Sequence, residues 1–408
     1  MASSSVRART AWKRLPLSSN YAVAYAVKDA DVDVVAAYPI TPQTTVVEKI
    51  SEFIANGELD AEMIHVESEH SALSTVVGAS AAGARAFTAT ASQGLELMHE
   101  ILHIASGMRL PIVMSIATRA LSAPISIWND YSDLMNTRDT SWVTLIASTA
   151  QEVYDTIIQA FRIAEDPRVM LPVMVAYDGY LMSHTYEPVL VPEDNSDILE
   201  YAPKNYDRYR LDPDRPITFG TITSPEWYYE FKYQQVEAMK RALSVVEEAD
   251  RDYKERFGRG YGLVEEYMAD DAEVVMLTYG GLYGTVQDVV DNLRSKGVRV
   301  GAVRLRLFRP FPAERLAEAV RGARLVIVVD KAISYGARIA GPVAMETITA
   351  LYGDPDAPEV MSVIAGIGQR TVTEDTIKEL FDYGFRVLDR GRVPRESLYW
   401  GVRGVEYE

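Results

Sequence analysis

The sequence predicts an α/β protein with two parts, each built around a parallel sheet. Three observations support this fold class. The chain of 408 residues is too long for one ordinary core. Its helical and extended segments alternate, and its extended segments are almost continuously apolar, as in parallel strands buried on both faces. With 48% apolar and 24% charged residues, the composition is that of a folded soluble protein.

The first part repeats one rhythm, which predicts a doubly wound parallel sheet. Its first helix has Ser18, Ser19 or Asn20 as possible caps, and its second ends at Gly57. We expect helices at 20–30, 42–57, 68–84, 95–108 and 149–166, and strands at 31–38, 61–67, 85–91, 110–118 and 172–178.

The second part is a further α/β unit that begins near Ala272. A proline- and aspartate-rich connection at 185–225 and a long charged helix at 225–258 precede it. We expect strands at 272–280, 298–308, 324–330 and 359–368, and helices at 285–297, 312–323, 335–353 and 373–384. "TYGGLYGT" (278–285) could be a phosphate loop, but a tight strand-to-helix turn is favoured there.

The predicted organisation has four segments. Residues 1–17 are basic, serine-rich and free of acids, and we expect a mobile or surface-lying arm. The arm loosely resembles a transit peptide, but it lacks the apolar core of a secretory signal, so we expect a cytoplasmic protein. The first domain spans 18–190, a linker and strut helix span 191–265, and the second domain spans 266–408.

Charge and cysteine content exclude several functions. The formal net charge of −17 disfavours binding to nucleic acid or to an anionic membrane, and no apolar run reaches membrane-spanning length. Without cysteine, the chain cannot ligate a conventional iron–sulfur cluster or use a thiolate nucleophile. His99 and His103 have a metal-chelating spacing, but no third ligand is evident nearby, so an ordinary helix face is favoured and we expect no metal site.

Polar residues follow four successive strands of the first domain. They occur in "YPITP" (38–42), "ESEH" (67–70), "SQG" (92–94) and "TRALSAP" (118–124). In an open parallel sheet, ligands bind beyond the carboxyl ends of the strands, so these groups should converge on one cleft.

Each of these groups has a functional and a structural interpretation. The prolines of "YPITP" would hold Thr41 rigidly at a substrate oxygen, or they merely end a strand and start a helix at Pro42. Glu67 or Glu69 is either a helix-dipole cap or a carboxyl of raised pKa facing the cleft. Arg119 pairs with a substrate carboxylate or with an internal one.

The third of these strand ends offers backbone groups. Ser92, Gln93 and Gly94 open a helix, and free amides there would suit an anion or a polar ligand.

Together these pieces resemble the α-type chain of the pyruvate:ferredoxin oxidoreductase family, the 2-oxoacid:ferredoxin oxidoreductases. The matching stretches cover most of the chain, from about residue 20 to about residue 400. They are "VVAAYPITPQT", "ESEHSA", "TATASQGLELM", "TRALSAPISIWNDYSDLMNTRDTSW", "ITFGTITSPEWYYEFKYQ" and "VRLRLFRPFP".

The resemblance implies a pyrimidine-type thiamine diphosphate-binding domain followed by a transketolase C-terminal-like domain. It also implies a separate β-type chain that carries the diphosphate-binding domain and Mg²⁺, because no Gly-Asp-Gly occurs here and the nearest stretch is "YDGY" (177–180). Iron–sulfur clusters would lie on partner chains, γ- and δ-type subunits among them. Ferredoxin would accept the electrons, and coenzyme A would accept the acyl group.

The resemblance also implies roles for individual residues. Thr41 matches the threonine that hydrogen-bonds the 2-oxoacid, next to Pro42, and Arg119 matches the arginine that pairs with its carboxylate. Glu69, rather than Glu67, matches the glutamate that contacts N1′ of the aminopyrimidine. The implied activity is oxidative decarboxylation of pyruvate to acetyl-CoA and CO₂.

Two alternatives stay open for the activity. One is the same chemistry on branched-chain 2-oxoacids such as 2-oxoisovalerate, since one or two methylenes are worth only about 1–3 kcal/mol. The other is a non-catalytic assembly subunit with a vestigial cleft. The sequence also departs from the family pattern: Ser19-Asn20 replaces a common Gly-Asn, and "GIGQRTVT" replaces a Gly-Gly-Arg-Asp pattern.

Overall fold

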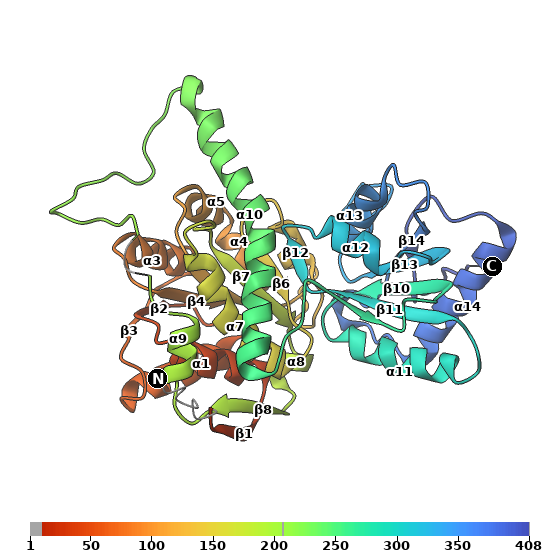
Figure 1. The fold of residues 1–408 in the computed structure, drawn as a ribbon, viewed down its shortest axis with the longest axis horizontal. Coiled ribbons are helices and arrows are strands. Elements are labelled where there is room, and N and C mark those ends of the chain that lie inside the picture. The colour runs from red at the N-terminus through yellow and green to blue at the C-terminus, as the bar shows by residue number, and fades with distance from the viewer. Residues whose placement is uncertain (1–9, 206–207, 408) are drawn as a thin grey trace, which may run out of the picture.

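The computed structural model describes residues 10–205 and 208–407. They form two parallel-type sheets, each with helices on both faces, and a two-stranded sheet at one side (Figure 1). The predicted fold class, α/β with a doubly wound parallel sheet in the first part, is confirmed.

The first sheet has seven strands in the order β12-β6-β7-β5-β4-β2-β3, and only β12 runs antiparallel to its neighbour. Its strands are β2 Val34–Ala36, β3 Glu62–Ile64, β4 Ala86–Thr90, β5 Ile112–Thr118, β6 Val143–Ile146, β7 Val173–Asp178 and β12 Leu307–Arg309. Its helices are α1 Ser19–Asp29, α2 Thr44–Ala55, α3 Glu69–Ala81, α4 Ser92–Leu97, α5 His99–Gly107, α6 Ser132–Asn136, α7 Ala150–Glu165 and α8 Leu181–His184.

The second sheet has six strands in the order β15-β14-β13-β10-β11-β9, with β9 antiparallel to β11. Its strands are β9 Val264–Tyr267, β10 Val274–Thr278, β11 Val300–Leu305, β13 Leu325–Asp330, β14 Glu359–Ile364 and β15 Leu398–Tyr399. Its helices are α11 Leu282–Arg294, α12 Ala313–Ala319, α13 Pro342–Leu351, the 3₁₀ turn Ile367–Gln369 and α14 Glu374–Arg390.

Helix α10, Pro225–Phe257, packs against α7 and α5 of the first domain and protrudes beyond it (Figure 1). Helix α9, Ser196–Tyr201, precedes it. The strut helix predicted over 225–258 therefore exists, but part of it lies on the first domain.

Several segments differ from the sequence-based expectation. Residues 12–17 of the predicted arm form β1 (Trp12–Leu17), which pairs antiparallel with β8 (Glu187–Pro192), whereas residues 1–9 lie outside the described part of the chain. The helix expected over 335–353 begins only at Pro342, because proline fits the first helical turn and disfavours helical backbone before it. The strand expected over 298–308 breaks after Leu305, and β12 crosses to pair with β6 of the first sheet.

The hydrophobic core is continuous between the sheets. One cluster of buried residues runs from the first sheet to one side of the second, and another lies between the second sheet and α11 and α14. None of the helices within the described residues is long and apolar enough to cross a membrane.

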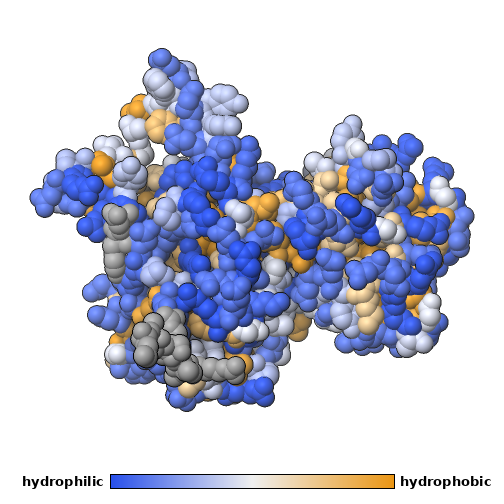
Figure 2. Space-filling view, in the orientation of Figure 1, coloured by the Kyte–Doolittle hydropathy of each residue, from blue (hydrophilic) through white to orange (hydrophobic). Residues whose placement is uncertain are grey.

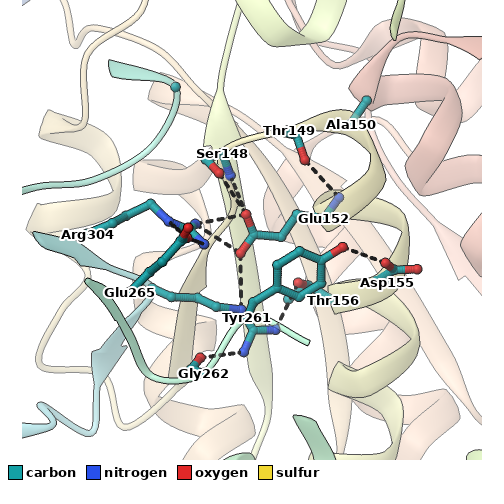
Figure 3. A network of polar contacts seen from close by, with 12 residues as sticks. Ser148, Thr149, Ala150, Glu152, Asp155, Thr156, Tyr261, Gly262, Glu265 and Arg304 are labelled. Atoms are coloured by element: carbon teal, nitrogen blue, oxygen red, sulfur yellow. Dashed lines mark hydrogen bonds and ion pairs between the residues drawn. The ribbon is translucent and has the colours of Figure 1, made fainter. Parts of the chain in front are cut away.

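A buried ionic network joins α7 to the second sheet (Figure 3). Arg304 of β11 donates from Nη1 to both Glu152 oxygens at 3.0 and 2.8 Å, and its Nε donates to Glu265 at 2.9 Å. Both Arg304 and Glu152 are about 1% exposed. Charges this deeply buried are stable only when paired, so the contact fixes how the two sheets are placed.

Candidate active site at the carboxyl edge of the first sheet

The "YPITP" loop follows β2 and is held from beneath by a buried amide. Asn20 of α1 donates to the carbonyl of Pro42 at 2.7 Å and to Thr45 Oγ1 at 2.8 Å, and its own oxygen accepts from the Tyr177 hydroxyl at 2.7 Å. Pro42 is buried, whereas Thr41 is exposed. Helix α2 begins at Thr44 rather than at Pro42. The loop therefore presents Thr41 at the surface on a fixed backbone.

Close packing behind the "YPITP" loop explains why residue 179 is a glycine. A Cβ on Gly179, just after β7, would lie 2.3 Å from the Thr118 carbonyl oxygen and 2.9 Å from Pro42 Cγ. A side chain at this position would push the "YPITP" loop away from β5.

Arg119 follows β5 and reaches the same loop. Its Nη1 donates to the carbonyl of Thr41 at 2.8 Å, and its Nε donates to the carbonyl of Ser126 at 2.9 Å. The side chain is 7% exposed, and burial lowers its pKa. These side-chain bonds go to neutral carbonyls rather than to a carboxylate, which favours the substrate-pairing interpretation over an internal salt bridge.

The structure separates the two glutamates. Glu69 is the first residue of α3 and is buried, at 7% exposed, next to the N-cap Ser68. Glu67 is exposed and accepts a hydrogen bond from Ser71, which lowers its pKa. Only Glu69 meets the requirement of a carboxyl group in a low-dielectric position.

Gly94 leaves the space that the Glu69 side chain uses. An added Cβ would lie 2.6 Å from Glu69 Oε1 and 2.5 Å from the hydroxyl oxygen of Thr90. That hydroxyl is buried and has no hydrogen-bond partner within the described residues. A carboxylate and an unpartnered hydroxyl thus lie side by side at the end of β4.

Two of the three amides that were expected to be free at "SQG" make internal hydrogen bonds. The amide of Ser92 donates to Asp133 Oδ2 at 2.8 Å, and that of Gly94 donates to the Ala91 carbonyl at 3.0 Å. Ser92 has a φ of 51° and donates its hydroxyl to the Ala120 carbonyl at 2.7 Å. Two amides of this turn are therefore used in internal bonds, and the prediction that the turn binds an anion or a polar ligand stays a prediction. Gln93 is half-buried beside it.

Asp133 is a supporting residue that sequence reasoning missed. Its Oδ2 accepts from the amides of both Ser92 and Arg119, at 2.8 and 3.0 Å, and so ties the end of β4 to the end of β5. Burial raises its pKa to about 7, although these amide bonds act in the opposite direction. The available signal was an acidic residue directly before the apolar pair Leu134-Met135 in "WNDYSDLM".

The site residues are thus linked by a chain of contacts. Thr41 contacts Arg119, Asp133 joins Arg119 to Ser92, and Gly94 packs against Glu69. The structure therefore brings the predicted hydroxyl, guanidinium and carboxyl groups to one edge of one sheet.

The second domain reaches the rim of this edge. The amide of Gly368 donates to Asp130 at 3.1 Å, and the side chain of Gln369 accepts from the Asn129 amide at 3.2 Å. The departure from the family pattern at "GIGQRT" therefore falls on a segment that contacts the loop following Arg119.

Apolar side chains surround the edge. Trp128 and Tyr180 pack edge to face with ring centroids 3.9 Å apart, and they are 40% and 36% exposed. Ile125 is 77% exposed and Leu181 51%.

The histidine pair of α5 does not belong to a larger metal-ligating group. The rings of His99 and His103 stack with centroids 5.4 Å apart, and no group of three or more metal-ligating side chains occurs among the residues that the structure describes.

The first domain is a doubly wound α/β domain whose polar groups lie at the carboxyl ends of neighbouring strands. Domains of this class bind small molecules at that edge of the sheet. Two family models match this chain: "Pyruvate flavodoxin/ferredoxin oxidoreductase, thiamine diP-bdg" over residues 25–251, and "Pyruvate:ferredoxin oxidoreductase core domain II" over residues 272–377. The chain belongs to the pyruvate flavodoxin/ferredoxin oxidoreductase family, and its first domain is of the thiamine diphosphate-binding type.

Curated relatives match nearly end to end. The chain is 47% identical to pyruvate synthase subunit PorA of Pyrococcus abyssi over 96% of this chain and 98% of that protein. It is 50% identical to PorA of Methanocaldococcus jannaschii over 90% and 94%. It is also 44% identical to ketoisovalerate oxidoreductase subunit VorA of Pyrococcus abyssi over 95% and 97%.

Two solved structures share the fold. A 2-oxoglutarate:ferredoxin oxidoreductase from Magnetococcus marinus matches 91% of this chain with a TM-score of 0.68 and 18% identity, and this chain spans 65% of that one. A split-gene transketolase matches 91% of this chain and 99% of its own, with a TM-score of 0.54 and 12% identity. Both likenesses concern the fold, and they agree with the predicted transketolase-like second domain.

Proposed function

We propose that this chain is the α-type subunit of a thiamine diphosphate-dependent pyruvate:ferredoxin oxidoreductase, a pyruvate synthase. The convergence of Thr41, Arg119 and Glu69 on one sheet edge is the observation that carries this proposal. The near full-length similarity to PorA subunits supports it. The reaction is oxidative decarboxylation of pyruvate to acetyl-CoA and CO₂, with ferredoxin as the electron acceptor.

The residues at the edge fit the pyrimidine half of thiamine diphosphate. The buried Glu69 carboxylate suits a ring nitrogen, and the unpartnered Thr90 hydroxyl lies next to it. Gln93 and Gly94 would complete this wall. When bound, the cofactor supplies the electron sink for decarboxylation.

The chain's own residues then have separate tasks. Glu69 holds or releases a proton at the ring nitrogen, because a buried carboxyl can act as an acid–base group. Arg119 pairs with the carboxylate of the 2-oxoacid through a charge-assisted bond, and Thr41 donates its hydroxyl to a substrate oxygen. Pro42 keeps Thr41 in place, which lowers the entropy lost when the substrate is ordered.

Partner subunits complete the enzyme in this proposal. A β-type subunit carries the diphosphate-binding domain with Mg²⁺, and γ- and δ-type subunits carry iron–sulfur clusters and pass electrons singly to ferredoxin. The chain has no cysteine to ligate a cluster, and the exposed Trp128, Tyr180 and Leu181 give the site edge an apolar rim suited to a covering subunit. We place the assembly in the cytoplasm.

The second candidate substrate is a branched-chain 2-oxoacid, which the 44% identity to VorA favours.

A comparison of substrates tests the proposed function. The assembly is purified with its partner subunits, and kcat/KM is compared for pyruvate and 2-oxoisovalerate, with coenzyme A and ferredoxin present. We expect pyruvate to be preferred. Preference for 2-oxoisovalerate would change the substrate, and no turnover of any 2-oxoacid would support the vestigial-cleft alternative.

A further inference from the structure

The first turns of α10 and the residues before it form a protruding segment, residues 222–236, which we term the aromatic arm (Figure 1). The first buried residue of α10 is Gln235, so the helix up to Gln234 stands clear of the body. Its large side chains are exposed: Trp227 57%, Tyr228 56%, Tyr229 76%, Phe231 48% and Tyr233 53%. Figure 2 shows a few hydrophobic groups, in orange, among pale and hydrophilic ones on this protruding end of the molecule.

The aromatic residues of the arm do not form a single stripe. Successive helical residues are turned by about 100°, so Trp227, Tyr228 and Tyr229 point in three different directions. Phe231 and Tyr233 fill the angles between them. Glu226, Glu230 and Gln234 lie together on the remaining side, so the arm is aromatic over most of its circumference and acidic along one strip. Such an arm is suited to a partner surface that offers both apolar and basic groups.

A hollow of matching character lies near the base of the arm. Its volume is about 480 Å³, and Pro167, Met170, Tyr209 and Ile217 contribute its apolar lining. Arg241 of α10 donates to the carbonyl of Arg168 at 2.9 Å, which places the base of the arm beside the 167–170 turn. The turn precedes β7, so the hollow lies at the opposite edge of the sheet from the candidate active site.

The hollow is rich in positive charge. Arg208, Arg210 and Arg215 line it, and Asp212, which pairs with Arg210 at 3.7 Å, is the acidic member of its lining. Within the described residues, Arg208 Nε and Nη1 are buried without hydrogen-bond partners. The arm in turn carries Glu226 and Glu230 among its aromatic side chains. Arm and hollow are thus complementary in both charge and apolar content.

We propose that the aromatic arm of one copy of this chain docks in the arginine-lined hollow of a second copy, and that the exchange is reciprocal about a two-fold axis. Such an isologous contact uses the same two surfaces on both copies. Glu226 and Glu230 of one arm face Arg210 and Arg215 of the other copy.

The area of the arm favours a reciprocal exchange. Ten helical residues form a cylinder about 15 Å long and about 10 Å wide, with a side wall of roughly 450 Å². The hollow of about 480 Å³ is smaller than this cylinder, so it receives one side of the arm, and one arm then buries roughly 450 Å² on the two surfaces together. Two exchanged arms bury roughly 900 Å², close to the area of about 1,000 Å² that a specific interface needs, whereas one arm alone stays far below it.

Photo-cross-linking in the complete assembly tests the exchange. Assemblies are made from a mixture of light and isotopically heavy copies of this chain, with p-benzoyl-phenylalanine in place of Tyr229. We expect cross-linked peptides that join the arm of one copy to residues 208–217 of another, seen as mixed light–heavy pairs. The same substitution at Tyr335, 88% exposed and in the second domain, should give no such pairs.

Other outcomes of the cross-linking contradict the proposal. Cross-links from position 229 to a different subunit would assign the arm to that subunit. Cross-links only within one copy, or none at all, would also overturn the exchange.

Charge reversal gives an independent test. Arg210→Glu with Arg215→Glu should lower the yield of mixed pairs at least about tenfold, because like charges would face each other. Adding Glu226→Arg and Glu230→Arg to that variant should restore the yield. Equal yields in all three proteins, with unchanged circular dichroism, would contradict the charge pairing and with it the proposed docking.

Discussion

Both sheets present the carboxyl ends of parallel strands at one edge, but the two edges use their polar groups in opposite ways. In the first sheet, Glu69 and Arg119 are buried next to an exposed Thr41, and Arg119 contacts neutral carbonyls. In the second sheet, Asp330 at the end of β13 accepts from the amides of Val343 and Ala344, both at 3.0 Å.

The second edge also serves as the contact with the first domain. Lys331 donates to Asp178 at 2.7 Å, and the Gly281 amide donates to the same carboxylate at 3.3 Å. Gly280, with a φ of 65°, lies so close to the Tyr131 hydroxyl that a Cβ would come within 2.2 Å of it. "TYGGLYGT" is thus a tight turn that packs against a neighbour. The comparison teaches that topology alone offers a site at both edges, and that only charged groups without internal charged partners mark the reactive one.

The largest expected effect comes from Glu69→Ala. We expect pyruvate-dependent reduction of ferredoxin to fall at least about 100-fold, because acid–base groups contribute about 10²–10⁴. Assembly with the partner subunits should be unchanged. Glu67→Ala is the matched control, since Glu67 is exposed at the same turn. Full activity of the Glu69 variant would remove this residue from the mechanism.

Lys331→Met probes the other edge. Removing one partner of a buried ion pair costs about 3–5 kcal/mol. We expect the free energy of unfolding, measured by denaturant titration, to fall by about 3 kcal/mol, while KM for the 2-oxoacid changes little. The exposed Lys378→Met serves as control. A large rise in KM without loss of stability would mean that the second edge belongs to the reaction site.

Arg119→Ala should act on substrate binding. A hydrogen bond to a charged group is worth about 1.5–3 kcal/mol, so we expect KM for pyruvate to rise roughly 10–100-fold. Arg119→Lys keeps the charge and should recover part of the loss. Kinetic constants equal to those of the natural chain in both variants would show that Arg119 only supports the loop.

The last prediction concerns the pH dependence of stability, where the effect on activity is smallest. Burial raises the pKa of both Asp133 and Asp330 from 3.8 to about 7. The folded state therefore binds protons more tightly, so the free energy of unfolding should fall as pH rises from about 4 to about 7 and then level off. Each Asp→Asn change should flatten this decline by up to roughly 4 kcal/mol, because one pKa unit is worth about 1.4 kcal/mol. Asp29, whose pKa is raised to about 6, acts with the same sign in both variants.

The turnover rate distinguishes the Asp133→Asn variant from the Asp330→Asn variant. Asp133→Asn should also lower turnover, because Asp133 joins the turns that carry Ser92 and Arg119, whereas Asp330→Asn should not. Equal turnover in the two variants would contradict a positioning role for Asp133.

The alternating pattern predicted the parallel α/β fold because buried strands and amphipathic helices leave strong local signals. Strand β6 was missed because a strand of only four residues leaves a weak signal in the sequence. Strand β12 was missed because it pairs with β6, which lies far away in the sequence. Strand β1 is amphipathic and gains its partner, β8, only through the fold.

The candidate site was predicted from strand ends and from the family resemblance, and its roles remain predictions. The side chains that position it were not foreseen. Asn20 and Asp133 act through backbone groups of distant loops, and such partners cannot be read from local sequence. Local pattern does not separate Glu69 from Glu67; the family resemblance favoured Glu69, and its burial agrees with that choice.

The buried pairing of Arg304 with Glu152 has a consequence for motion. Any hinge opening between the sheets would leave two bare charges in an apolar environment, at a cost of several kcal/mol. The two halves of this chain should therefore travel as one body during turnover. In the proposed enzyme, movements that admit substrates or release product would then be the task of partner subunits, or of loops such as the one after Arg119.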